Sequence, residues 1–181
     1  MPHRPVASRA VALTLALLLG LAACGDDPDE GTTDEVDGAE IEAGQSNLHV
    51  EGPIDYDADP PSGGDHAPPP EWLDCDVYDV PVPNENAVHS LEHGAVWFAH
   101  DPDADVDVDA LVALAGDAPD RVIVSPYPDL PAPVVAVAWE RRLETDSADD
   151  PRLAEFLETY VNGPAAPEPG ATCSGGVGLS R

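Results

Sequence analysis

The sequence predicts an α+β fold: a small sandwich with a mostly antiparallel sheet and two helices, preceded by an arm rich in proline and glycine. Two runs of Val, Ile and Ala, at residues 121–125 and 134–143, are typical of buried strands. A third strand is predicted at residues 95–99, which read AVWFA. The order strand, helix, strand, strand, helix favours helices packed against one face of a sheet.

The chain opens with the features of an export signal. Residues 1–23 hold no acidic residue, and Arg4 and Arg9 precede an apolar run that is short for a membrane span. The run ends in LAAC at residues 21–24, which matches the bacterial lipobox. We therefore expect a lipoprotein signal peptide at residues 1–23, a lipid on Cys24, and an extracytoplasmic protein anchored to the bacterial cell membrane. An ordinary signal peptide and a retained anchor helix are the alternatives.

An acidic segment follows. Residues 25–46 contain nine acidic residues and no basic or aromatic ones, which is too little apolar surface to offset the loss of chain entropy on folding. We expect residues 24–46 to form a disordered tether, with cation sequestration as the alternative role. Residues 47–181 are long enough for a single domain with its own core.

Overall charge excludes one class of partner. The chain has 36 acidic and 7 basic residues, no lysine, and a formal net charge of -29. Nucleic-acid binding requires clustered Lys and Arg, so no nucleic-acid partner is expected.

The arm at residues 47–86 is rich in Pro, Gly and Asp, so regular structure there is short, with Trp72 and Tyr78 as expected anchors on the core. One helix is predicted at residues 105–115, between an Asp-rich start and Gly116. Another begins after Asp150, which caps it, and carries one apolar stripe to residue 161. The loop at residues 126–133 is short enough to join the two flanking strands as an antiparallel pair.

Once Cys24 is assigned to the lipid, Cys75 and Cys173 remain. An exported protein folds in an oxidising compartment, so the pair predicts a disulfide. Two unpaired buried thiols are the alternative, and a zinc site is disfavoured because the paired short spacing of zinc motifs is missing.

The sharpest local feature is the segment His89-Ser90-Leu91-Glu92-His93-Gly94. On a helical turn, residues four apart lie on one face, so His89 and His93 could hold one transition-metal ion. Glu92 is close to the same face and could ligate, orient a ligand or act as a base.

Zinc requires three or four protein ligands, so the pair needs partners. His66 is the natural third ligand, and His49 and then His100 come after it. Imidazole ligands favour copper or zinc. The alternative is a packing role, in which the imidazoles bond to backbone or to Glu92 and organise a loop.

Other motifs fail their structural requirements. The pattern H-x-x-E-H also occurs in one class of zinc protease, but Gly94 and a strand follow at once and leave no long helix. Alternating Asp residues from Asp101 begin like a calcium loop, yet Val106 and Val112 stand where Gly and Glu are required. No G-x-S-x-G nucleophile motif is present.

Several segments together resemble the bacterial family DUF3105. The specific part is the HSLEHG segment at residues 89–94, supported by His49-Val50, by the turn from Pro60 to His66, by Ser125-Pro126-Tyr127 and by Ala138-Trp139. The resemblance covers nearly all of residues 47–163. It implies export and frequent membrane anchoring, and it implies no particular activity.

Three functions remain open. The first is a lipoprotein domain that binds copper or zinc through His66, His89 and His93, with Glu92 or His49 in support. The second is a small metal-dependent enzyme, for which Glu92 is the only candidate base. The third is a structural or interaction protein whose histidines hold the arm against the sheet.

Overall fold

The structure, a computed structural model, describes residues 35–179. The expected signal peptide and the lipid-bearing Cys24 lie outside these residues, as does the first part of the expected tether. Among the described residues, no helix combines the length and the apolar character that crossing a membrane requires.

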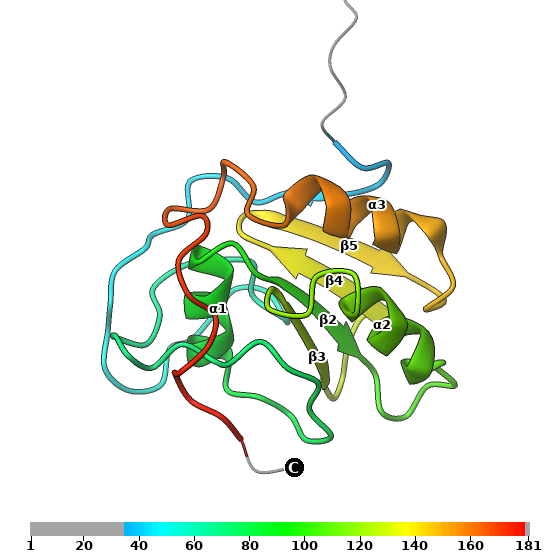
Figure 1. Cartoon of the computed structure of the whole chain (residues 1–181), viewed down its shortest axis with the longest axis horizontal. Helices are drawn as coiled ribbons and strands as arrows, with labels where there is room; N and C mark the ends of the chain where they lie inside the picture. The colour runs from blue at the N-terminus through cyan, green and yellow to red at the C-terminus, as the bar shows by residue number, and fades with distance from the viewer. Residues whose placement is uncertain (1–34, 180–181) are drawn as a thin grey trace, which may run out of the picture. The chain divides into compact units, whose positions relative to one another are not determined.

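A five-stranded sheet forms the middle of the fold, in the order β1-β5-β4-β2-β3 (Figure 1). Neighbouring strands are antiparallel except for β2 and β3, which are parallel. The α+β class with a mostly antiparallel sheet is therefore confirmed. The strands are β1 (Glu40–Ile41), β2 (Val96–His100), β3 (Val122–Pro126), β4 (Val134–Ala138) and β5 (Arg141–Thr145).

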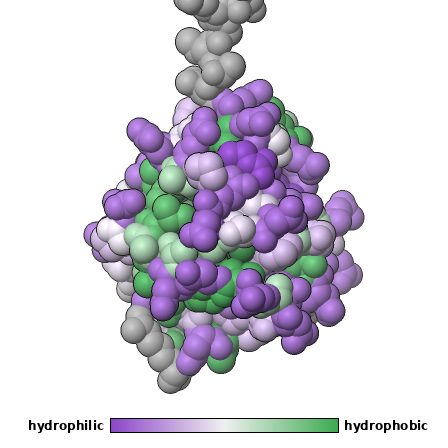
Figure 2. Space-filling model, turned by 90° about the vertical axis from the view of Figure 1, so that its right-hand side faces the viewer, coloured by the Kyte–Doolittle hydropathy of each residue, from purple (hydrophilic) through white to green (hydrophobic). Residues whose placement is uncertain are grey.

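Residues 35–179 contain three helices instead of the expected two: α1 (Asn84–Glu92), α2 (Val108–Ala115) and α3 (Pro151–Tyr160). Helices α2 and α3 cover one face of the sheet, where Phe98 and Phe156 are fully buried. Helix α1 and the arm cover the other face, where Leu73 and Trp97 are fully buried. The side of the folded unit in Figure 2 is mostly hydrophilic, with separate hydrophobic patches.

Side-chain caps fix the starts of α2 and α3. The carboxylate of Asp107 accepts the backbone N–H of Ala110, and that of Asp150 accepts the backbone N–H of Arg152. The cap on α3 is the predicted one, whereas α2 begins at Val108, later than the sequence suggests.

Two strand predictions were wrong. The segment at residues 134–143 is not one strand, because the chain turns at Trp139 and Glu140. Glu140 has a φ of 57°, and β5 then pairs back on β4. Strands β3 and β4 are not an antiparallel pair, because β2 lies between them. The connection through α2 places β3 parallel to β2, and β4 pairs along the opposite side of β2. Residues 76–78 then cover the outer edge of β3.

The expected boundary between the tether and the domain, at residue 47, was also wrong, since the fold begins earlier. Val36 is 3% exposed in the core, and β1 pairs with β5 at Glu40 and Ile41. The carboxylate of Glu140 accepts the backbone N–H groups of Gly44 and Gln45 at 2.6 and 3.0 Å. Backbone pairing needs no apolar side chains, which is why an acidic segment joins the sheet.

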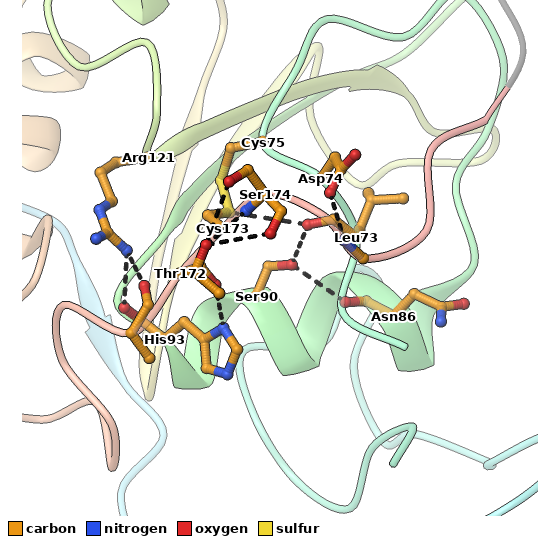
Figure 3. The surroundings of a disulfide bond; sticks show 12 residues. Leu73, Asp74, Cys75, Asn86, Ser90, His93, Arg121, Thr172, Cys173 and Ser174 are labelled. Carbon is orange, nitrogen blue, oxygen red and sulfur yellow. Dashed lines mark hydrogen bonds between the residues drawn. A yellow bond between two sulfur atoms is a disulfide. The ribbon is translucent and has the colours of Figure 1, made fainter. Parts of the chain in front are cut away.

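Cys75 and Cys173 form the disulfide that the cysteine count predicts, with Cα atoms 5.4 Å apart (Figure 3). The backbone N–H of Cys75 also donates to the carbonyl of Cys173 at 2.8 Å. The bond therefore holds the C-terminal segment against the arm, beside the last turn of α1.

Candidate metal centre

Helix α1 carries two of the residues that the HSLEHG segment predicts to act together. His89 and Glu92 are three residues apart and are 1% and 3% exposed, so they lie buried near one face of the helix. The chain leaves the helix at Gly94, which has a φ of 89°. A Cβ atom at this position would lie 2.8 Å from the Cα atom of Asn162, so both the turn and the close approach require glycine.

The arm contributes two more histidines by pairing with itself. Residues 49 and 66 form a parallel β-bridge, in which Val50 N–H donates to the carbonyl of His66 and His66 N–H donates to that of Leu48. The bridge places the rings of His49 and His66 with centroids 4.8 Å apart. The ring of His89 lies about as close to each, at 5.1 and 5.0 Å.

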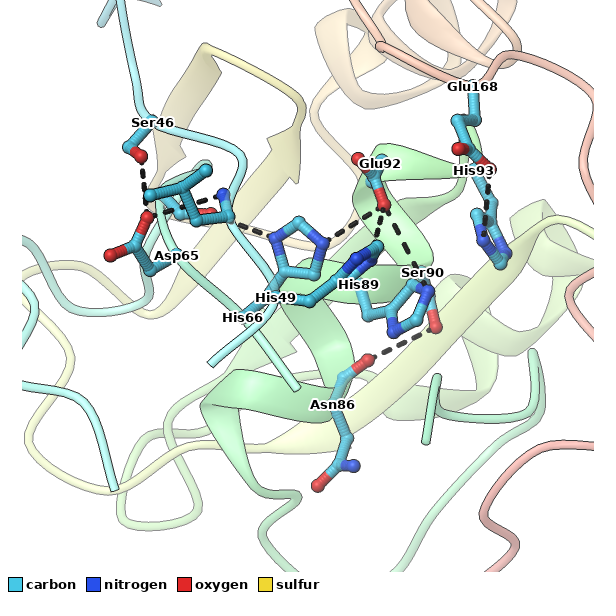
Figure 4. Close-up of polar contacts among 12 residues, drawn as sticks. Ser46, His49, Asp65, His66, Asn86, His89, Ser90, Glu92, His93 and Glu168 are labelled. Carbon is cyan, nitrogen blue, oxygen red and sulfur yellow. Dashed lines mark hydrogen bonds and ion pairs between the residues drawn. The ribbon is translucent and has the colours of Figure 1, made fainter. Parts of the chain in front are cut away.

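These three imidazoles converge on one carboxylate oxygen (Figure 4). The Nε2 atoms of His66, His49 and His89 lie 3.0, 3.5 and 3.9 Å from Oε2 of Glu92. The four residues offer ligand atoms that all lie within 4.8 Å of one another. We call this group, His49, His66, His89 and Glu92, the inner cluster.

The hydrogen bonds of His66 define its protonation. Its Nδ1 lies 2.9 Å from the carbonyl of Gly64, which can only accept, so Nδ1 carries a proton. Burial lowers the pKa of His66, but hydrogen bonds to Glu92 and Gly64 outweigh burial and raise the pKa above 6.5. Burial likewise raises the pKa of Glu92, and the hydrogen bond from His66 reverses the shift and lowers it. Without a metal, and below the raised pKa of His66, an imidazolium–carboxylate pair therefore forms the centre of the cluster.

His89 is in the opposite situation. Burial lowers its pKa to about 4, with the repulsion of neighbouring His93 and His66 in support, so its ring is neutral near pH 7. Its Nδ1 is buried and has no hydrogen-bond partner among the described residues. A buried nitrogen without a partner is costly, and a metal on Nε2 would place the ring proton on this same Nδ1.

Tryptophan side chains enclose the cluster. The ring of Trp139 meets that of His66 edge-on, with centroids 5.9 Å apart, and the ring of Trp72 lies 5.7 Å from that of His89. His49 is the open side, since its side chain is 36% exposed. Solvent and ions therefore reach the cluster past His49.

His93 does not join the inner cluster, although the sequence favours it as a ligand beside His89. Its Nδ1 donates to the carbonyl of Thr172 at 2.6 Å, and its Nε2 lies 3.9 Å from Oε2 of Glu168 (Figures 3 and 4). It follows the last residue of α1, so its ring turns toward the C-terminal segment. His49, expected only in a supporting role, takes the third position.

The donor atoms suit a transition metal. With metal–ligand bonds of about 2.0–2.2 Å, ligand atoms of a tetrahedral site lie about 3.4 Å apart. The three distances from Glu92 Oε2, 3.0 to 3.9 Å, bracket that value. Three imidazole nitrogens and one carboxylate oxygen form a donor set that zinc and copper accept. The proton on Nδ1 of His66 leaves Nε2 as the ligand atom, and the Gly64 carbonyl orients the ring as the outer partners of metal-bound histidines do.

Sequence reasoning missed Glu168, which is one of 36 acidic residues and has no distinguishing neighbour. It also could not tell that Trp72 and Trp139 border the cluster. His100, the weakest histidine candidate, lines a separate cavity of about 520 Å³ with Tyr78 and Pro126.

Comparison with known proteins gives one family. The family described as "Protein of unknown function (DUF3105)" matches residues 49–175, a segment that includes every residue of the inner cluster. No curated protein and no solved structure matches the chain. Since the match covers well over half of the chain, this protein belongs to the DUF3105 family.

Proposed function

We propose that this protein binds one transition-metal ion, zinc or copper, at the inner cluster. The observation that carries the proposal is the convergence of His49, His66 and His89 on one oxygen of Glu92. These residues come from two places in the arm and one helix, and a packing role would not require their nitrogens to meet at a point. We further propose that the domain is held outside the cell membrane by a lipid on Cys24.

Charge supports cation binding at this place. Glu92 is almost fully buried, and the proton on His66 that neutralises it is released when a metal takes Nε2. The strongly acidic chain also raises the local concentration of cations.

A binding role is favoured over an enzyme. Five cavities of 280 to 580 Å³ in the described part of the molecule are lined by residues outside the inner cluster. Glu92 is already engaged as the shared partner of three histidines, so it is poorly placed to act as a free base.

The test is a titration of the full chain with Zn²⁺ and Cu²⁺, combined with elemental analysis. We expect one tightly bound ion per chain in the wild type and an affinity at least tenfold lower in His66→Gln and His49→Gln. His49 is the safer variant because its side chain is 36% exposed and its loss leaves the core intact.

His100→Gln is the matched control, because His100 is buried but lies outside the cluster. Wild-type affinity in this control and weakened affinity in the two cluster variants support the proposal. Equal affinity in all four proteins, or no bound ion in the wild type, refutes it.

A further inference from the structure

A second group of ligand atoms lies on the other side of Glu92. Glu92, His93 and Glu168 offer atoms that all lie within 4.8 Å of one another, and His93 Nε2 is 3.9 Å from Glu168 Oε2. Figure 4 shows His93 beside Glu168, and the ring of His93 also lies against that of His89, with centroids 4.7 Å apart, so the two groups adjoin. We call Glu92, His93 and Glu168 the outer group, and Glu92 belongs to both.

The hydrogen bond of His93 uses Nδ1 and leaves Nε2, the nitrogen that faces Glu168, for a metal. Nδ1 faces the carbonyl of Thr172 at 2.6 Å and must carry the proton of the neutral ring. Nε2 then has its lone pair toward Glu168. His66 has the same arrangement, with Gly64 in the place of Thr172. A backbone carbonyl on the far nitrogen is the usual support of a metal-bound histidine.

The backbone fixes the position of Glu168. Its N–H donates to the carbonyl of Glu92 at 3.0 Å, and Gly170 N–H donates to the carbonyl of His93 at 3.1 Å. The guanidinium of Arg121 also binds the carbonyls of His93, Gly170 and Ala171 (Figure 3). The loop at residues 168–171 is therefore attached to the end of α1, and the backbone of Glu168 is held close to His93.

The outer group is more open than the inner cluster. Glu168 is 58% exposed, against 36% for His49 of the inner cluster, while His93 and Glu92 are 5% and 3% exposed. Three protein ligands at a solvent-facing site leave a coordination position for water, and three ligands hold an ion less tightly than four.

We propose that the outer group binds a second transition-metal ion, more weakly than the first and sharing Glu92 with it. This inference rests on the proposed function, because the shared carboxylate couples the two positions. The two carboxylates of the outer group supply the negative charge that a second cation beside the first requires.

The experiment is a calorimetric titration of the full chain with Zn²⁺, with elemental analysis after dialysis against low free zinc. We expect two ions per wild-type chain, the second bound at least tenfold more weakly than the first. In Glu168→Gln we expect one ion, bound with the affinity of the first. Because Glu168 is mostly exposed, this substitution leaves the fold intact.

Glu155→Gln is the control, since it removes an equal charge from an exposed position on α3. Two ions in this control and one in Glu168→Gln support the outer position. One ion in the wild type, or two in Glu168→Gln, overturns it and leaves the inner cluster as proposed. A wild-type chain that binds no zinc at all refutes the proposed zinc site as well.

Discussion

The two faces of the sheet are covered in different ways. On one face, α2 and α3 pack against the sheet through apolar side chains, and Val96, Phe98 and Leu153 are fully buried. On the other face, α1 and the arm are held by polar contacts as well as by Leu73 and Trp97. We call them the helical face and the histidine face. The buried residues of the inner cluster and the outer group all belong to segments that cover the histidine face.

The difference shows where the fold tolerates polar groups. Regular helices satisfy their own backbone, so the helical face needs only apolar contacts with the sheet. The polar groups of an irregular arm need hydrogen-bond partners. His66 of the arm has such a partner in Glu92 of α1. We therefore expect core substitutions on the helical face to lower stability without changing metal affinity. Core substitutions on the histidine face should lower both.

Phe156→Ala gives the largest expected effect. It removes a fully buried side chain from the helical face, and we expect the free energy of unfolding to fall by about 3–5 kcal/mol, with unchanged zinc affinity of the folded protein. Chemical denaturation and a zinc titration measure the two quantities.

Leu91→Ala is the matched variant on the histidine face. Leu91 is also fully buried and lies on α1, so its loss lowers stability by about 2–5 kcal/mol and weakens zinc binding as well. Equal zinc affinity in both variants would show that the two faces are not separate.

Removal of the disulfide comes next. We expect Cys75→Ser/Cys173→Ser to lower the free energy of unfolding by about 2–4 kcal/mol, because the bond closes a segment of 98 residues. We expect the stability to be lost on the histidine face, because the disulfide at Cys173 holds Thr172 beside His93. Amide hydrogen exchange checks this: protection should fall in residues 168–179 and stay unchanged in α3. Uniform loss in both regions would contradict the comparison.

The smallest effect, taken over one pH unit, is a pH dependence of the metal-free protein. Because the pKa of His89 is about 4 in the fold against an ordinary 6.5, the unfolded chain binds a proton in this range that the folded state does not. The contribution of His89 to stability is therefore complete above about pH 6.5 and is lost as the pH falls toward about 4. We expect metal-free His89→Gln to lose less stability over this range than the wild type, by up to about 1.4 kcal/mol per pH unit.

His66 changes the stability with pH in the opposite direction to His89. Its raised pKa contributes stability below about pH 6.5 that is lost as the pH rises through the folded pKa. Urea denaturation of His89→Gln and His66→Gln at a series of pH values should change the profile below about pH 6.5 in the first variant and above it in the second. Profiles parallel to that of the wild type would rule out both assignments.

The helical face could be predicted well from the sequence. The cap at Asp150, the stop at Gly116 and the apolar spacing of α3 are local signals, and they place both helices. The turn inside residues 134–143 could not be predicted, because no Gly or Pro marks it at Trp139 and Glu140. The parallel pairing of β3 depends on the crossover through α2, which no local pattern encodes.

The histidine face could be predicted only in part. The spacing of His89 and Glu92 on one turn is local, and it identified both residues. The direction of His93 depends on Thr172, which is 79 residues away and is held by the disulfide. The position of His49 depends on a β-bridge within the arm, and that of Glu168 on backbone bonds to the end of α1. Such long-range contacts are not visible in a single sequence.

The segment along β3 has a consequence for neighbouring molecules. Tyr78 N–H donates to the carbonyl of Val124, and Val124 N–H donates to that of Asp76, so the chain itself occupies the outer hydrogen-bonding groups of this strand. The opposite border of the sheet ends in a strand of only two residues. Exposed strand borders are templates for fibre-like aggregation, and this protein offers a template of little length in its described part. At Val124, a strand from another molecule would have to displace residues 76–78 before it could pair with β3.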